Sequence, residues 1–289
     1  MTEKLPLSYY KKEIKRLRKV IKELSPSIEA LLRKRGLKIH TKEPSDDLLI
    51  PEPLYIEEYY RKLHKYSFRL FLRDVIKFQK GFTPAQVTHY ATEKVTKEYI
   101  SYLKNIKLVD KFPDRELFFL TRPVKSFGET LEWFFSEILK REFLMDSTWG
   151  IRFKKPAISP KGEISAGGDY DVIAKFNNSI LYAEIKSSPP KQIYQKEIKA
   201  FLKRIKTLSP ELSIFFMDTE LRMKDKIVPM FEEELSNFFK EPPPVERIEK
   251  EIFHIANTLY IMNSKDSIIY NIEIVLSWYH KYKHGGLNL

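Results

Sequence analysis

Residues 168–188, GDYDVIAKFNNSILYAEIKSS, constrain the fold more than any other part of the chain. Residues 171–176 and 180–186 are rich in the β-branched, aromatic and apolar residues that strands favour. Between them lie three turn-forming residues, Asn177, Asn178 and Ser179. The stretch therefore predicts a β-hairpin within a larger sheet.

The predicted hairpin carries an unusual concentration of charge. Side chains two residues apart on a strand share a face, so Glu184 and Lys186 point the same way, as do Asp169 and Asp171 on the other strand. Such charges are costly on a buried sheet unless they are paired or bind a metal. Two carboxylates that can hold a hard divalent cation, beside a lysine, suit hydrolysis of a phosphodiester.

These residues resemble the PD-(D/E)XK nuclease family, which includes restriction enzymes and archaeal Holliday-junction resolvases. Asp171 occupies the position of the metal-binding aspartate, and Glu184-Ile185-Lys186 matches E-x-K, whereas Tyr170 replaces the proline. The resemblance implies that Asp171, Glu184 and the Ile185 carbonyl hold Mg²⁺ or Mn²⁺. It also implies that Lys186 positions or deprotonates the attacking water, leaving 5′-phosphate and 3′-hydroxyl ends.

The resemblance further implies a carboxylate on an upstream helix. Residues 126–143 predict such a helix, with an apolar face at three- and four-residue spacing. Glu132 fits the family position best, as a catalytic residue that assists the metal directly or through water, and Glu129 is the alternative. The competing interpretation is a salt-bridged hairpin with no catalytic role.

A second resemblance covers residues 66–122. Residues 54–80 predict a long helix, and Thr83-Pro84-Ala85-Gln86 predicts a capping box that opens a helix to about residue 91. A helix over 96–106 and two short strands, 108–111 and 117–120, complete a pattern similar to the winged helix-turn-helix family.

The winged-helix resemblance implies a DNA-binding surface. Lys97, Ser101 and Lys104 would enter the major groove, and Lys107, Lys111 and Arg115 would lie near phosphates. Winged helices also serve as protein-interaction modules, which is the alternative.

Charge favours a nucleic-acid partner. A formal net charge of +12 and a pI near 9.4 favour a polyanion, because each neutralised phosphate releases counterions. We expect duplex or branched DNA, with RNA and an anionic membrane surface as alternatives. The sequence has no long apolar segment, signal peptide or P-loop. We therefore expect a soluble, cytoplasmic protein with no membrane partner and no nucleotide cofactor.

The whole chain predicts an α/β (α+β) protein in four parts. Residues 1–53 form a basic helical arm and linker, 54–123 a winged-helix domain, 124–241 a nuclease domain with a restriction-endonuclease-like mixed sheet, and 242–289 a C-terminal helical extension. Helices are expected at 8–24, 245–262 and 266–282. The apolar stripe of the first, from Tyr10 to Leu24, or the C-terminal helices could provide a homodimer interface. Asp218 is expected to be a turn residue.

Overall fold

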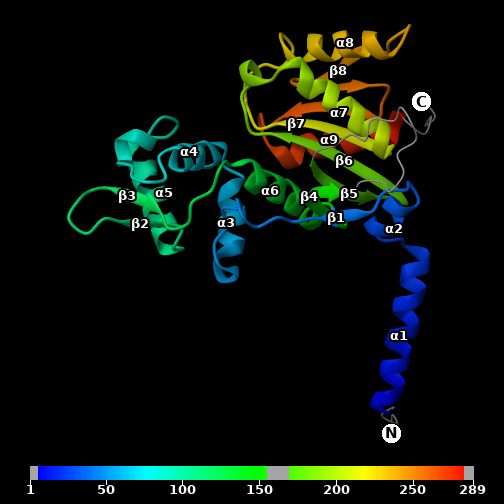
Figure 1. Cartoon of the computed structure of the whole chain (residues 1–289), viewed down its shortest axis with the longest axis horizontal. Helices are drawn as coiled ribbons and strands as arrows, with labels where there is room; N and C mark the ends of the chain where they lie inside the picture. The colour runs from blue at the N-terminus through cyan, green and yellow to red at the C-terminus, as the bar shows by residue number, and fades with distance from the viewer. Residues whose placement is uncertain (1–5, 155–168, 283–289) are drawn as a thin grey trace.

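A single sheet organises the molecule, which is a computed structural model describing residues 6–154 and 169–282 (Figure 1). The sheet has eight strands in the order β1-β4-β5-β6-β7-β10-β9-β8. Neighbours are antiparallel from β1 to β6, parallel across β6, β7 and β10, and antiparallel again to β8. The strands are β1 Ile39–Thr41, β4 Ser147–Phe153, β5 Tyr170–Phe176, β6 Ser179–Lys186, β7 Leu212–Met217, β8 Val245–Glu249, β9 Ile252–Ile255 and β10 Leu259–Asn263.

The predicted hairpin is confirmed as β5 and β6. Val172 pairs with Ala183 and Phe176 with Ser179, so the turn is formed by Asn177 and Asn178. Asn177 has φ of 54°, a left-handed conformation that asparagine tolerates better than most residues.

Helices cover both faces of the sheet. On one face, α6 (Gly128–Arg141) and α9 (Ile268–Tyr282) pack on alternate residues of β5, β6 and β7. On the other face lie α2 (Ile28–Arg33), α7 (Gln195–Leu208) and α8 (Ile227–Phe238), with the short 3₁₀ helix η3 (Pro190–Gln192) leading into α7. Covering both faces explains why the central strands are almost entirely apolar. The mixed α/β class predicted from the sequence is confirmed.

A helical unit lies at one end of the sheet (Figure 1). It consists of η1 Pro53–Tyr55, α3 Ile56–Leu63, α4 Tyr66–Lys77, η2 Pro84–Val87 and α5 Glu93–Asn105, followed by the hairpin of β2 Val109–Lys111 and β3 Phe118–Leu120. The predicted helix over 54–80 is broken near Lys65, where the backbone is extended. The Thr83–Gln86 capping box forms but opens only a 3₁₀ turn, and Thr92 caps α5, which begins at Glu93, three residues before the predicted start.

The C-terminal region corrects the prediction most. The predicted helix over 245–262 is wrong, because these residues form β8, β9 and β10 and extend the sheet. All residues of β9 and β10 are buried, so apolar residues follow one another and mimic a helical spacing. Left-handed residues at Lys250, Ala256 and Asn257 mark the turns between these strands. Of the two helices predicted in this region, only the one at 266–282 exists, as α9.

In the N-terminal part, the predicted helix over 8–24 is confirmed, but the predicted linker contains a strand. The first helix is α1 (Leu7–Leu24), which extends away from the body in Figure 1. The predicted linker contains β1, whose Ile39 pairs with Phe153 of β4. No helix within residues 6–154 and 169–282 is both long and apolar enough to cross a lipid bilayer.

Candidate active site

The register of the hairpin places the predicted carboxylates together. Val172 pairs with Ala183, and continuing this antiparallel register puts Asp171 opposite Glu184. The Asp171 Oδ2 atom accepts a hydrogen bond of 2.7 Å from the Ile185 N–H, which fixes the carboxylate against β6. Both carboxylates are buried. The sequence thus brings two acids to the same end of two adjacent strands.

Glu184 is the most heavily contacted group of the site. Lys186 Nζ donates to its Oε1 at 2.8 Å, and Arg204 Nη1 of α7 lies 2.7 Å from both carboxylate oxygens. The Tyr182 hydroxyl donates to Oε2. Burial acts to raise the pKa of Glu184, but the charges of Lys186 and Arg204 outweigh it and lower the pKa. Glu184 is therefore a charge-balanced carboxylate.

Asp171 has the opposite balance. Burial raises its pKa to about 8, the neighbouring Glu184 carboxylate adds to the shift, and Lys186 opposes it. For Lys186 itself, burial acts to lower the pKa, but Glu184 and Asp171 outweigh burial and raise it. Lys186 therefore carries a proton at neutral pH, whereas Asp171 lacks enough positive charge to remain fully ionised.

Glu132 adds a third carboxylate from α6. Burial raises its pKa well above the ordinary value, and Asp171 is the largest of the charges that add to the shift. Within the described part of the chain, Glu132 accepts no hydrogen bond and forms no salt bridge. The alternative, Glu129, accepts a hydrogen bond of 3.2 Å from the Asp47 N–H. Glu132 thus lies within reach of the charge of Asp171, while Glu129 is engaged with the segment before α3.

The donor set suits a hard divalent cation in part. Asp171 and Glu132 offer carboxylate oxygens and an excess of negative charge, which is the environment that Mg²⁺ and Mn²⁺ prefer. Both Glu184 oxygens already contact cationic side chains. Among the residues described, no three His, Cys, Asp or Glu side chains gather closely enough to form a metal group. Asp171 and Glu132 have the donor chemistry for such a cation, and Glu184 would have to exchange a contact to Arg204 or Lys186.

Sequence reasoning missed Arg204. Its guanidinium also lies 6.0 Å from the ring centre of Tyr170, the residue that replaces the family's proline. The available signal was its place on α7, between Phe201 and Leu208 of the buried face. A charged residue on the packed face of a helix usually has a buried partner, and here that partner is Glu184.

Asp218 lies in a bend after β7, as expected, but it is also the partner of two arginines. It follows β7, is completely buried, and accepts hydrogen bonds from Arg69 Nε and Nη2 at 2.8–3.0 Å and from Arg73 Nη2. Both arginines lie on α4, four residues apart and therefore on one face. The Asp218 N–H also donates to the Lys186 carbonyl at 2.8 Å. This ion pair joins the helical unit to the strand next to the candidate site.

The predicted DNA-binding residues are all exposed on the helical unit. Lys97, Ser101 and Lys104 share one face of α5, but Lys97 forms a 2.6 Å salt bridge with Glu93. Lys97 and Ser101 line a shallow hollow of about 560 Å³ together with Lys94, Glu93 and Glu98. Acidic residues thus interrupt the basic face of α5.

The three remaining residues lie around the β2–β3 hairpin. Lys107, which follows α5, is 3.3 Å from Glu52, and Lys111 is the last residue of β2. Arg115 lies in the connection between β2 and β3. None of these six residues contacts the carboxylate cluster among the hydrogen bonds and salt bridges of the described chain.

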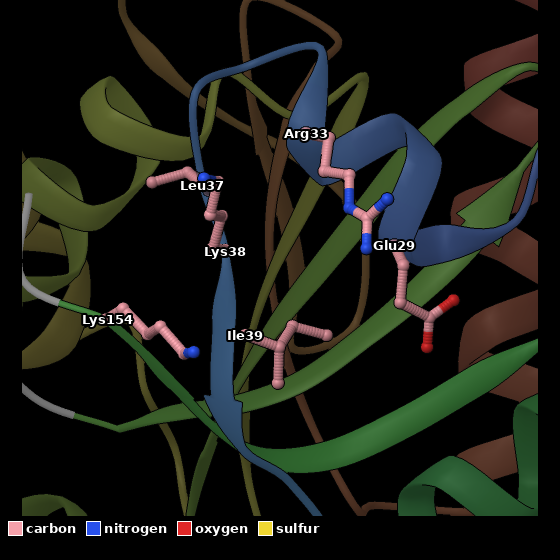
Figure 2. Close-up of a pocket in the computed structure, with 6 residues that line it drawn as sticks. All are labelled: Glu29, Arg33, Leu37, Lys38, Ile39 and Lys154. Carbon is pink, nitrogen blue, oxygen red and sulfur yellow. The ribbon is translucent and has the colours of Figure 1, made fainter.

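A second hollow, of about 410 Å³, lies elsewhere on the sheet. Figure 2 shows Glu29 and Arg33 of α2 on one side and Lys154, after β4, on the other, with residues 37–39 between them. Glu29 is already paired with Lys42 at 2.9 Å. This hollow shares no lining residue with the carboxylate cluster.

Comparison with known proteins identifies no family and no curated protein that matches the sequence. Solved structures that match include Can2 from Sulfobacillus thermosulfidooxidans in complex with cyclic tetra-adenylate, at a TM-score of 0.49 and 13% identity. Protein VC1899 from Vibrio cholerae matches at a TM-score of 0.47 and 12% identity. The matches cover 88% and 91% of this chain but only 60% and 63% of those two chains.

Proposed function

We propose that this protein is a metal-dependent endonuclease that hydrolyses phosphodiester bonds in DNA. The observation that carries the proposal is the group of charged residues at the open end of the β5–β6 hairpin, away from its turn. There Asp171 lies opposite Glu184, Lys186 binds Glu184, and the pKa of Glu132 on α6 is raised by burial and by the charge of Asp171. The resemblance to PD-(D/E)XK nucleases, noted on the same residues, supports this assignment.

Asp171 and Glu132 would hold Mg²⁺ or Mn²⁺, with Glu184 and the Ile185 carbonyl as further oxygen donors. When bound, the cation would neutralise charge on a phosphate group and lower the pKa of nearby water. Lys186 keeps its proton, so it would act as a donor that orients water or a phosphate oxygen rather than as a base. Arg204 would hold Glu184 in place.

The net charge of +12 supports a polyanionic substrate. We propose that the helical unit binds DNA through the exposed residues of α5 and the β2–β3 hairpin. They are Lys97, Ser101, Lys104, Lys107, Lys111 and Arg115. Because these side chains lie outside the carboxylate cluster, binding and cleavage should be separable by mutation.

The test is incubation of supercoiled plasmid with the protein and Mg²⁺ or Mn²⁺, alongside EDTA. Asp171→Asn and Lys186→Met should each lower the cleavage rate by about 10²- to 10³-fold, the loss typical of a single electrostatic stabiliser. Both should retain DNA binding in a gel-shift assay. Glu234→Gln, which alters a buried carboxylate on α8, is the matched control and should cleave like wild type. Equal cleavage by wild type and Asp171→Asn would refute the proposal.

A second candidate is a non-catalytic DNA-binding regulator. It is favoured by the contacts of Glu184, whose two oxygens are already engaged by Lys186 and Arg204. This alternative predicts metal-independent DNA binding and no cleavage of plasmid, single strands, junctions or RNA. The same plasmid assay, extended to these substrates, separates the two candidates.

A further inference from the structure

Helix α1 exposes a continuous apolar stripe. Six large apolar side chains are 46–75% exposed, and they follow one another at spacings of three, four, three, four and three residues. They are Leu7, Tyr10, Ile14, Leu17, Ile21 and Leu24. Spacings that alternate between three and four average 3.5 residues, which is the repeat of a coiled-coil seam.

Within residues 6–154 and 169–282, no other part of the chain covers this helix. No residue of α1 with a described side chain is buried, and Figure 1 shows α1 extending away from the sheet and its helices. An 18-residue helix is close to the length at which isolated helices are only marginally stable in water, and most helical stability comes from packing of the apolar face. A partner that buries the exposed stripe would therefore stabilise α1.

We propose that α1 pairs with α1 of a second copy of this chain as a parallel, two-stranded coiled coil. In heptad terms, Leu7, Ile14 and Ile21 occupy a positions, whereas Tyr10, Leu17 and Leu24 occupy d positions. β-Branched residues at a combined with leucine at d favour parallel dimers. Ile14 and Ile21 at a, with Leu17 and Leu24 at d, supply this combination.

Charges beside the seam favour the parallel orientation. Glu13 occupies a g position and Arg18 the e position five residues later, so each Glu13 lies next to Arg18 of the other copy in a parallel pair. In an antiparallel pair, e positions face e positions, which would bring Lys11 against Arg18. At present Glu13 contacts Arg16 of its own helix at 2.6 Å, and Arg16 lies outside the seam. The flanking charges thus match a second copy in parallel register.

The outer positions also fit this partner. Lys12, Lys15 and Arg16 occupy f, b and c positions, which point away from a two-stranded seam and stay in water. If the proposed function holds, pairing through α1 would bring two nuclease sites into one particle, one for each strand of a duplex. The dimer itself does not depend on that function, and its test measures no cleavage.

The first test is light scattering behind gel filtration over a concentration series of the full-length protein. Wild type should be dimeric at the upper concentrations, and Leu17→Asp, which places a charge at the centre of the seam, should be monomeric. Lys12→Asp, a change at an f position, should remain dimeric and serves as the control. Circular dichroism melting should show that Leu17→Asp leaves the folded body intact. A monomeric wild type, or a dimer that survives Leu17→Asp, would overturn the proposal.

The second test addresses the orientation. In a parallel dimer, Glu13→Arg and Arg18→Glu each place like charges across the seam, so each variant alone should dimerise less than wild type. Mixed in equal amounts, the two variants should form heterodimers, because both cross-seam pairs are then attractive. Native mass spectrometry distinguishes the species, since the variants differ in mass. Failure of the mixture to restore dimers would contradict the parallel register.

An anionic lipid surface is the competing occupant of an amphipathic basic helix. Wild type should remain in the supernatant when sedimented with vesicles of phosphatidylcholine and phosphatidylglycerol. If wild type is monomeric and sediments with these vesicles, and Leu17→Asp abolishes sedimentation, the stripe is a membrane-binding face. That result would overturn the coiled coil.

Discussion

At the scale of single residues, the buried Glu184 carboxylate is balanced by Lys186 from its own strand and by Arg204 from α7. The sequence could predict that Glu184 and Lys186 share a face, because they lie two residues apart on one strand. It could also predict Asp171 on the neighbouring strand, because the two strands form a hairpin. Arg204 lies twenty residues further along the chain and reaches Glu184 from α7. A contact of that kind depends on how α7 packs on the sheet, which local periodicity does not specify.

The pair formed by Arg204 and Glu184 should contribute substantially to stability. Removing one partner of a buried ion pair leaves an uncompensated charge, so Arg204→Met should lower the free energy of unfolding by about 3 kcal/mol. Arg204→Met combined with Glu184→Gln should be less destabilising than the sum of the single changes. Chemical denaturation measures these values. The control is Arg152→Met, whose salt bridge with Asp169 is exposed and should be worth less than about 1 kcal/mol. Equal effects of both arginine changes would argue against a buried pair.

Asp171 should make the metal-free protein less stable as pH rises from about 4 to about 8. Its folded pKa of about 8 exceeds the ordinary value of 3.8, so between these values the folded state binds more protons than the unfolded state. The contribution of Asp171 to stability is therefore greatest below about pH 4 and falls as pH rises to about 8. Asp171→Asn removes this loss, and its melting temperature should rise relative to wild type across that range. Thermal melts in EDTA check the trend, and a constant difference would contradict it.

Added Mg²⁺ should stabilise wild type most at the upper end of that pH range. A cation and a proton compete for the same carboxylate, so binding strengthens as Asp171 loses its proton. Mg²⁺ should therefore raise the melting temperature of wild type more at pH 8 than at pH 6. The Asp171→Asn variant is the control and should show a small increase at both values. A Mg²⁺ effect of equal size in wild type and variant would place the cation elsewhere.

At the scale of elements, the sequence predicted well those parts whose periodicity had a single interpretation. The β5–β6 hairpin has a two-residue asparagine turn, and α6 has one apolar face, so both formed where expected. β9 and β10 are buried on both faces, so their sequences lack the alternation of polar and apolar residues that marks a strand. Their runs of apolar residues fit a helix as well as a strand. Pairing of β10 with β7 across more than forty residues, and of β9 with β10, decided their structure.

Strand β4 contains a position that only glycine fits. Gly150 has φ of 58°, and a Cβ atom there would lie 2.4 Å from Cδ of Pro44. Gly150→Ala should cost about 1–2 kcal/mol for the left-handed backbone and more for the displaced Pro44 ring. Gly36→Ala is the control, because Gly36 has φ of 76° but open space around it. Denaturation should show a clearly larger loss at Gly150, and equal losses would mean that Pro44 moves freely.

At the scale of the whole molecule, the helical unit and the sheet share one core. Buried residues of α3, α4 and α5 belong to the same apolar cluster as α6, α9 and the inner strands. The sequence placed a domain boundary at residue 123, yet Arg69 of α4 is 1% exposed and binds Asp218 beyond β7. Because an arginine so deeply buried requires its counter-charge, the two parts depend on each other for stability.

This shared core predicts that the molecule unfolds as one cooperative unit. Asp218→Asn removes the negative charge that compensates Arg69 and Arg73, so it should lower the free energy of unfolding by about 3–5 kcal/mol. In a background carrying Trp149→Phe and Trp278→Phe, Trp133, whose ring centre lies 6.4 Å from that of Tyr59 of α3, reports on the junction by fluorescence, while far-UV circular dichroism reports on all helices and strands. In wild type and variant alike, both signals should change at one denaturant concentration. Two separated transitions in Asp218→Asn would instead mean that the helical unit and the sheet fold independently, with Asp218 joining two autonomous domains.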